Sequence, residues 1–235
     1  MDARQLREIG TVGLGSGVLL VVVNLLHPIG NTELYGDGVK FVAKMDTFWV
    51  ILHLIIAVTL LPVPMVIRGW VGTLSTERAR VWGHFGLALI MMGTVIGSIH
   101  LAGIDGVALP AFGNVLRGPG GGPELKAAAA ALLKVHLTTY ISWVVVFWMA
   151  GQAAMAFAAF LDPRQPRGLA ILSTLGAGFA LASVLTTALA GQLTTLSEGG
   201  LFRPSTVAFT IFYLWISFRL RRSQAAAATA AVAAA

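Results

Sequence analysis

The stretch that decides the fold is Gly93-Thr94-Val95-Ile96-Gly97-Ser98-Ile99-His100, which continues as Leu101-Ala102-Gly103-Ile104-Asp105-Gly106. It ends a long apolar run, and about 20 helical residues are enough to cross the hydrocarbon core of a bilayer. The stretch therefore predicts the end of a membrane-spanning helix that carries His100 to one face of the membrane. The glycine-rich segment after it predicts a turn that holds the carboxylate of Asp105.

The composition of the whole chain predicts several such helices. Of the 235 residues, 57% are hydrophobic and 11% are charged, whereas soluble domains contain about 25% charged residues. This shortage of charge indicates several bilayer spans rather than one soluble core. The chain has no cysteine, which excludes disulfides, thiol catalysis, iron–sulfur clusters and thiolate metal sites.

The net charge of +6 does not indicate a nucleic-acid partner. The basic residues lie in short loops between apolar runs, and they form no stripe interleaved with aromatic side chains. The sequence also has no P-loop and no dinucleotide-binding glycine motif after a strand. The expected partners are the lipid bilayer and a lipid-soluble small molecule.

The apolar runs predict an all-α, polytopic integral membrane protein, a bundle of six transmembrane helices in a single domain over residues 1–222. An alanine-rich tail, 223–235, is predicted to be disordered. Pro28 should end the first helix at His27, because the residue before a proline disfavours the helical conformation. The expected spans are 11–27, 45–67, 81–102, 130–160, 169–193 and 204–219.

The longest segment between predicted spans is 103–126, which is rich in glycine and proline. We expect a loop here, and loops of this length are often functional or disordered. Its first half is apolar enough to lie against the bundle, and its Gly-Pro-Gly-Gly-Gly-Pro half is typical of a flexible linker. A second, shorter loop is expected at 194–203.

The basic residues also predict the orientation. One set of short loops and both chain ends hold most of the arginines, whereas the acidic residues gather on the other side. Short cytoplasmic loops carry an excess of positive charge. We therefore expect a multi-pass protein of the cell membrane with both termini in the cytoplasm.

Four of the five histidines are expected at a common depth near the outer face. His27 ends the first span, His53 lies a few residues into the second, His100 ends the third and His136 lies near the outer end of the fourth. His84 lies about 24 Å from His100 along the same helix, on the inner side. A lone histidine near a helix end is commonly an interfacial residue, but four at one depth suggest a shared site.

Several kinds of chemistry fit four imidazoles without a thiol. Two histidines on facing helices can hold haem b, and imidazoles with a carboxylate can bind iron, copper or zinc in a redox role. Without a metal, histidine and aspartate can act as acid and base on a lipid or isoprenoid substrate. The sequence leaves open whether the protein is an enzyme, a transporter or a non-catalytic scaffold.

The candidate residues follow from these alternatives. Expected ligands of a metal or haem are His53 and His136, with His100 and His27 as additional ones. The expected catalytic pair is Asp105 with His100. Gly93 and Gly97 share a helix face with His100, and they indicate either close helix packing or a groove for a flat cofactor or lipid chain.

Overall fold

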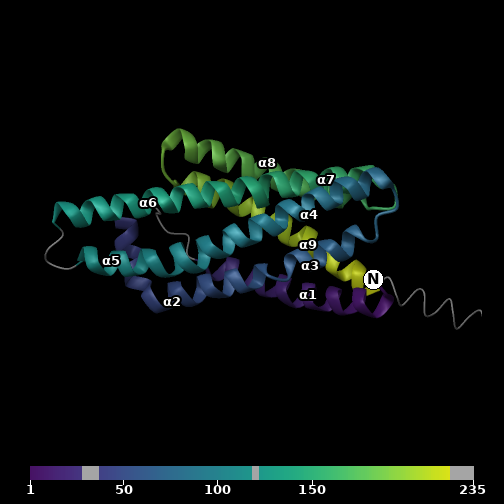
Figure 1. Ribbon diagram of the computed structural model, residues 1–235, viewed down its shortest axis with the longest axis horizontal. Coiled ribbons are helices and arrows are strands. Elements are labelled where there is room, and N and C mark those ends of the chain that lie inside the picture. Colours follow the sequence, from purple (N-terminus) through teal and green to yellow (C-terminus); the bar gives the residue numbers. More distant parts are fainter. Residues whose placement is uncertain (28–36, 118–121, 223–235) are drawn as a thin grey trace, which may run out of the picture.

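The computed structural model describes residues 1–27, 37–117 and 122–222, and it confirms the all-α prediction. These residues form a long bundle of helices without strands (Figure 1). The predicted disordered tail, 223–235, lies outside the described residues.

Six helices in this part of the chain are long and apolar enough to cross a membrane, as predicted. All but the fifth are longer than the expected spans, and two of them, with 37 and 39 residues, far exceed the length that a bilayer requires. They cover Ala3–Leu26, Met45–Val71, Glu77–Gly113, Pro123–Leu161, Arg167–Ala190 and Leu196–Arg222.

Within these spans the helices break or change their hydrogen-bonding pattern at several points. The α-helices are α1 (Ala3–Leu26), α2 (Asp37–Leu60), α3 (Val63–Val71), α4 (Glu77–Ser98), α5 (Leu109–Arg117), α6 (Pro123–Trp143), α7 (Gln152–Leu161), α8 (Arg167–Ala190) and α9 (Arg203–Arg222). Three π-helices join some of them: η1 (Ile99–Ala108), η2 (Val144–Gly151) and η3 (Leu196–Phe202).

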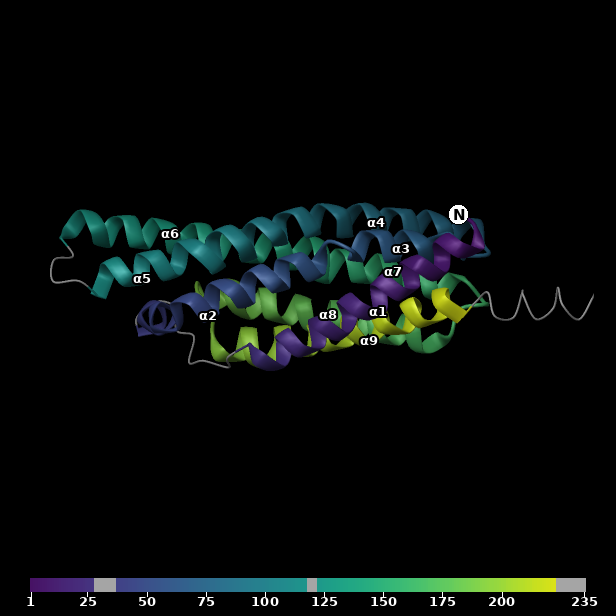
Figure 2. The same cartoon turned by 90° about the horizontal axis from the view of Figure 1, so that it is seen from below.

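The prediction of a loop over 103–126 was wrong for most of its length. The third span continues through η1 and α5 to Arg117, and α6 begins at Pro123. α5 packs against α2, where Leu109 is buried. This tertiary packing outweighs the low helix propensity of the glycines. As a result, α5 and the start of α6 project beyond the ends of α1 and α8 (Figure 2). The loop expected at 194–203 is likewise replaced in part by η3.

The first and last helices close the bundle by direct backbone contact. Gly10, Gly13 and Gly17 are buried on one face of α1, against α9. A Cβ atom at Gly10 would lie 2.6 Å from the Ser217 carbonyl oxygen and 2.7 Å from the Arg221 nitrogen. This contact places the start of α1 and the end of α9 at one end of the bundle, which we call the terminal end (Figure 1).

A buried carboxylate joins two turns at the terminal end. Asp162, 1% exposed, accepts hydrogen bonds from the Ser75 backbone nitrogen and hydroxyl, both at 2.6 Å, and from the Arg164 nitrogen at 2.9 Å. Burial disfavours the charged carboxylate, but these hydrogen bonds outweigh it and lower the pKa of Asp162. The α3–α4 turn is thereby fixed to the α7–α8 turn.

Gly10→Ala should destabilise the bundle, because the new methyl group meets backbone atoms that cannot rotate away. Overpacking of this kind costs about 1–3 kcal/mol. Gly15 lies on the same helix with nothing within 4 Å of its Cβ position, so Gly15→Ala is the matched control. It should be neutral or slightly stabilising, since alanine favours helix. Thermal unfolding in detergent measures both, and equal melting temperatures would contradict the contact.

Asp162→Asn should lower stability by about 1–3 kcal/mol at neutral pH, because it removes the acceptor of charge-assisted hydrogen bonds. The pKa of Asp162 is lower in the folded state than its ordinary 3.8. Its contribution is therefore fully present above that value and is lost as the pH falls through the folded pKa. Melting temperatures of the two proteins should differ at pH 7 and converge as the pH falls from 3.8 through the lower folded pKa. The exposed Glu77→Gln is the control, and a similar loss in that variant would rule out the buried carboxylate as the cause.

Candidate metal site in a buried histidine–aspartate cluster

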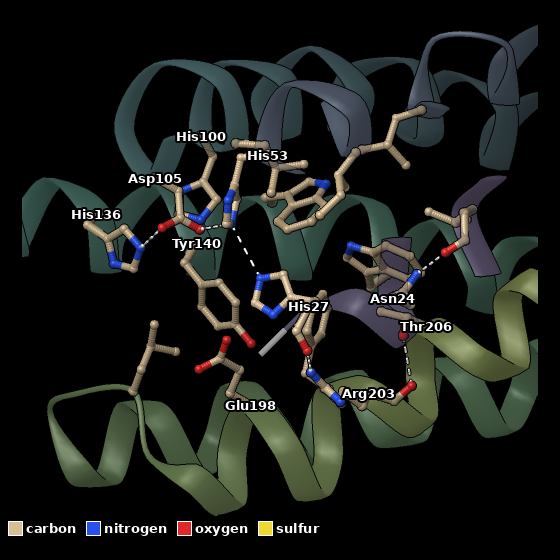
Figure 3. Close-up of a pocket in the computed structure, with 18 of the residues that line it drawn as sticks. Asn24, His27, His53, His100, Asp105, His136, Tyr140, Glu198, Arg203 and Thr206 are labelled. Carbon is tan, nitrogen blue, oxygen red and sulfur yellow. Dashed lines mark hydrogen bonds and ion pairs between the residues drawn. The ribbon is translucent and has the colours of Figure 1, made fainter. Parts of the chain in front are cut away.

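The structure brings the four predicted histidines and Asp105 to the wall of one cavity (Figure 3). His27 follows the end of α1, His53 lies on α2, His136 lies on α6, and η1 carries both His100 and Asp105. Three of the imidazoles are almost completely buried, with exposures of 0% for His53, 1% for His100 and 3% for His136. The fifth histidine, His84, is exposed on α4 and does not join this cluster.

The Asp105 carboxylate lies at the centre of the cluster. Its Oδ2 atom is 3.1 Å from His53 Nε2, and its Oδ1 atom is 3.6 Å from His136 Nε2. His27 Nε2 lies 3.3 Å from His53 Nε2. His100 packs its ring against His136 at a centroid distance of 4.8 Å. One ligand atom each from His100, Asp105 and His136 falls within 4.8 Å of the others.

The π-helix η1 explains why His100 and Asp105 share one face. The two residues are five positions apart, a spacing that an α-helix would place on different faces. A π-helix is hydrogen-bonded between residues i and i+5, so positions five apart lie nearly above one another. Asp105 was expected in a turn, and that expectation was wrong. π-helical turns are rare in proteins as a whole, but those that occur are often found at functional sites.

Trp49 orients two members of the cluster at once. His53 Nδ1 lies 2.9 Å from the Trp49 carbonyl oxygen, which can only accept a hydrogen bond. His53 therefore carries a proton on Nδ1, and its Nε2 faces the carboxylate. The Trp49 indole nitrogen in turn donates to the Asp105 carbonyl oxygen at 2.9 Å. This fixes α2 to η1 directly beside the site.

A threonine sets the orientation of His100 in a similar way. His100 Nδ1 lies 2.9 Å from Thr139 Oγ1, and the Thr139 hydroxyl donates its own proton to a carbonyl oxygen of α6, that of Val135 or His136. The threonine oxygen must then accept from His100, which assigns the proton to Nδ1 and a lone pair to Nε2. Ligating histidines commonly donate their second N–H group in this manner.

Three further polar residues line the cavity (Figure 3). Tyr140 lies on α6, Glu198 on η3 and Arg203 at the start of α9. The guanidinium of Arg203 donates a hydrogen bond to the carbonyl oxygen of His27 and so satisfies the end of α1. Sequence reasoning missed Glu198 and Arg203 as site residues, because their segment was expected to be a loop.

The glycine face of the third span is filled by aromatic side chains. Gly93 lies against Phe147, and Gly97 lies against Trp143. Of the two alternatives for this face, the structure supports close helix packing over a groove for a flat cofactor or lipid chain. The cavity beside the cluster has a volume of about 90 Å³. This is enough for a few water molecules or a small ligand, and less than the roughly 300–1,000 Å³ of pockets for drug-sized ligands.

No known family model, curated protein or solved structure matches the chain. Function therefore has to be inferred from the geometry of the site.

Thr139→Val should disturb the tautomer of His100, because it leaves a buried N–H group without an acceptor at a cost of about 1–3 kcal/mol. The neighbouring Thr138 is exposed and donates only to the Lys134 carbonyl oxygen, so Thr138→Val is the matched control. Nitrogen-15 NMR of labelled histidine should show a smaller Nδ1–H population for His100 in the first variant alone. The same tautomer in both variants would refute the role of Thr139.

Proposed function

We propose that the protein binds one divalent transition-metal ion in the histidine–aspartate cluster and that the ion has a redox role. The proposed ligands are His100, His136 and Asp105, whose ligand atoms lie within 4.8 Å of one another, and His53 and His27 lie on the other side of the carboxylate. The site lies at the outer edge of the cell membrane, in a chain whose termini are both cytoplasmic.

The observation that carries this proposal is the convergence of hydrogen-bond acceptors. With its proton on Nδ1, neutral His53 presents only a lone pair at Nε2. That lone pair faces a carboxylate oxygen at 3.1 Å and another imidazole nitrogen at 3.3 Å. A lone pair and a carboxylate oxygen repel one another, and burying them without compensation is unfavourable, whereas the role of His27 Nε2 depends on its tautomer. A positive ion bound to the carboxylate lessens this repulsion.

The distances fit a metal ion better than a proton. Imidazole nitrogens bind zinc at about 2.0–2.1 Å in tetrahedral geometry, which separates neighbouring ligand atoms by roughly 3.3 Å. The ligand atoms of His100, Asp105 and His136 lie within 4.8 Å of one another, so modest side-chain shifts would bring them to this separation. One proton on His53 would bridge a single pair of atoms, and it would leave His100 and His136 unexplained on the other side of the carboxylate.

The ligand types favour particular ions. Imidazole suits iron, copper, nickel and zinc, and two histidines with one carboxylate are typical of non-haem Fe(II) sites that keep open positions. The redox role rests on this ligand set. Haem b is less well supported, because the cavity of about 90 Å³ is small and the Asp105 side chain occupies the space between the histidines. The same small volume disfavours an isoprenoid substrate for a metal-free acid–base reaction of Asp105 and His100.

The depth of the cluster supports a place at the membrane surface. At about 1.5 Å per residue, the helix from Glu77 to His100 is roughly 35 Å long. This length slightly exceeds the ~30 Å thickness of a hydrocarbon core. If α4 begins at one edge of the core, His100 therefore lies near the opposite edge. The arginine-rich turns, the start of α1 and the end of α9 lie at the terminal end, which the positive-inside rule assigns to the cytoplasm.

Full-length protein purified in detergent should bind Fe²⁺, Co²⁺ or Zn²⁺ at one ion per chain, measured by elemental analysis after removal of free metal. Asp105→Asn removes the anionic ligand and should weaken binding by more than about 100-fold. His84→Ala is the matched control, since its imidazole is exposed and distant, and it should bind like the unchanged protein. Cobalt absorption bands report the geometry of the site directly.

Two results would count against this function. Absence of stoichiometric metal from the unchanged protein would overturn it, as would equal affinity in Asp105→Asn. A Soret band with one haem per chain after reconstitution would replace the bare ion with haem b.

A further inference from the structure

A continuous line of buried aromatic rings joins the cluster to the terminal end of the bundle. We call it the aromatic relay, and its members are Trp143, Trp148, Phe209, Phe212 and Trp70. Each of them is at most 4% exposed. Trp143 and Trp148 also line the cavity of the site, but none of the five is a proposed ligand.

The first part of the relay starts at a proposed metal ligand. The His100 ring lies 5.8 Å from the ring of Trp143, and Trp143 lies 5.7 Å from Trp148. Trp148 contacts Phe209 at 5.2 Å. All these are centroid distances within the usual range for packed aromatic pairs.

The second part reaches the turns at the terminal end. Phe209 lies 6.4 Å from Phe212, and Phe212 lies 5.5 Å from Trp70. The indole nitrogen of Trp70 donates to the Gln165 side-chain oxygen at 3.2 Å, in the α7–α8 turn. The relay thus runs from the metal-binding cluster to the turn that Asp162 fixes.

Packing alone does not account for the tryptophans. The indole N–H groups of Trp143 and Trp148 are buried and have no hydrogen-bond partner among the described residues. Each such group costs about 1–3 kcal/mol, and phenylalanine could fill much of the same space without that cost. The property that tryptophan adds to phenylalanine, once its hydrogen bond is unused, is an electron-rich ring that can be oxidised by one electron. A redox role is a recognised reason for unsatisfied buried groups.

We propose that Trp143 and Trp148 pass one-electron oxidising equivalents from the bound metal ion, through Phe209 and Phe212, to Trp70. The relay rests on the proposed function, because the bound metal ion is the group that oxidises the first tryptophan. With hydrogen peroxide as oxidant, one peroxide, two protons, one Fe²⁺ and one tryptophan give two waters, one Fe³⁺ and one tryptophan radical cation. The positive charge then moves to Trp70 when Trp70 donates an electron that tunnels through the packed Phe212 and Phe209 rings, which are too hard to oxidise to carry the charge themselves.

The hydrogen bonds determine where the charge comes to rest. A tryptophan radical cation is stabilised when its N–H group donates to an acceptor, and neither Trp143 nor Trp148 has one among the described residues. Trp70 has the Gln165 oxygen. Oxidation is therefore more favourable at Trp70 than at the two indoles nearest the metal, and the histidine ligands are protected from oxidation.

The test uses full-length protein loaded with Fe²⁺, whose metal content is measured first, and one equivalent of hydrogen peroxide. Peptide mass spectrometry then quantifies oxidised tryptophan. Buried Trp70 should be oxidised more than Trp82, which is 38% exposed and lies outside the relay. Trp148→Phe should reduce oxidation at Trp70 severalfold and raise it at Trp143 and the histidines, with iron content unchanged. Trp82→Phe is the matched control and should leave oxidation at Trp70 unchanged.

The possible failures are distinguishable. If the unchanged protein binds no iron, both the proposed function and the relay are overturned. If iron is bound but Trp70 is oxidised no more than Trp82, or no less in Trp148→Phe, only the relay is wrong. Should Trp148→Phe not fold, Phe212→Leu interrupts the relay far from the metal ligands, and unchanged oxidation at Trp70 in that variant would also overturn it.

Discussion

The arrangement of the site depends on one buried anion. The Asp105 carboxylate lies between His53 and His136, in a bundle whose helices expose many large hydrophobic side chains. A carboxylate is unfavourable in such surroundings unless positive groups or donors surround it. The helices that supply the histidines are held by uncharged contacts: the Trp49 indole, the Thr139 hydroxyl and glycine faces. These contacts hold the histidine and aspartate side chains close together, which would limit the reorganisation required by the proposed metal binding.

Much of the fold and part of the site could be predicted from the sequence, because the length of an apolar run fixes depth in a membrane. That relation placed His27, His53, His100 and His136 at one level, and the structure brings them together. The end of α1 was also predicted correctly, from the effect of Pro28 on the residue before it. The helix ends at Leu26, and His27 is its cap.

The rest could not be predicted, because it depends on tertiary contacts. Glycine-rich sequence favours loops locally, yet Leu109 and its neighbours bury against α2 and keep the third span helical. No sequence pattern identifies a π-helix, so neither the shared face of His100 and Asp105 nor the approach of Glu198 could be foreseen. Each of the three π-helices supplies at least one residue to the cavity, among them Leu101, Trp148 and Phe202.

The contact between the first and last helices has a consequence for biogenesis. Arg203, on the final span, donates to the carbonyl oxygen that ends α1 at His27, and α1 packs along α9. During synthesis the ribosome releases α1 long before α9 exists. The nascent chain can insert all of its histidines, but it cannot complete the cavity until the sixth span has entered the membrane. For the proposed metal site, acquisition of the ion would then follow synthesis, and a chain truncated before α9 would carry the proposed ligands without a finished cavity.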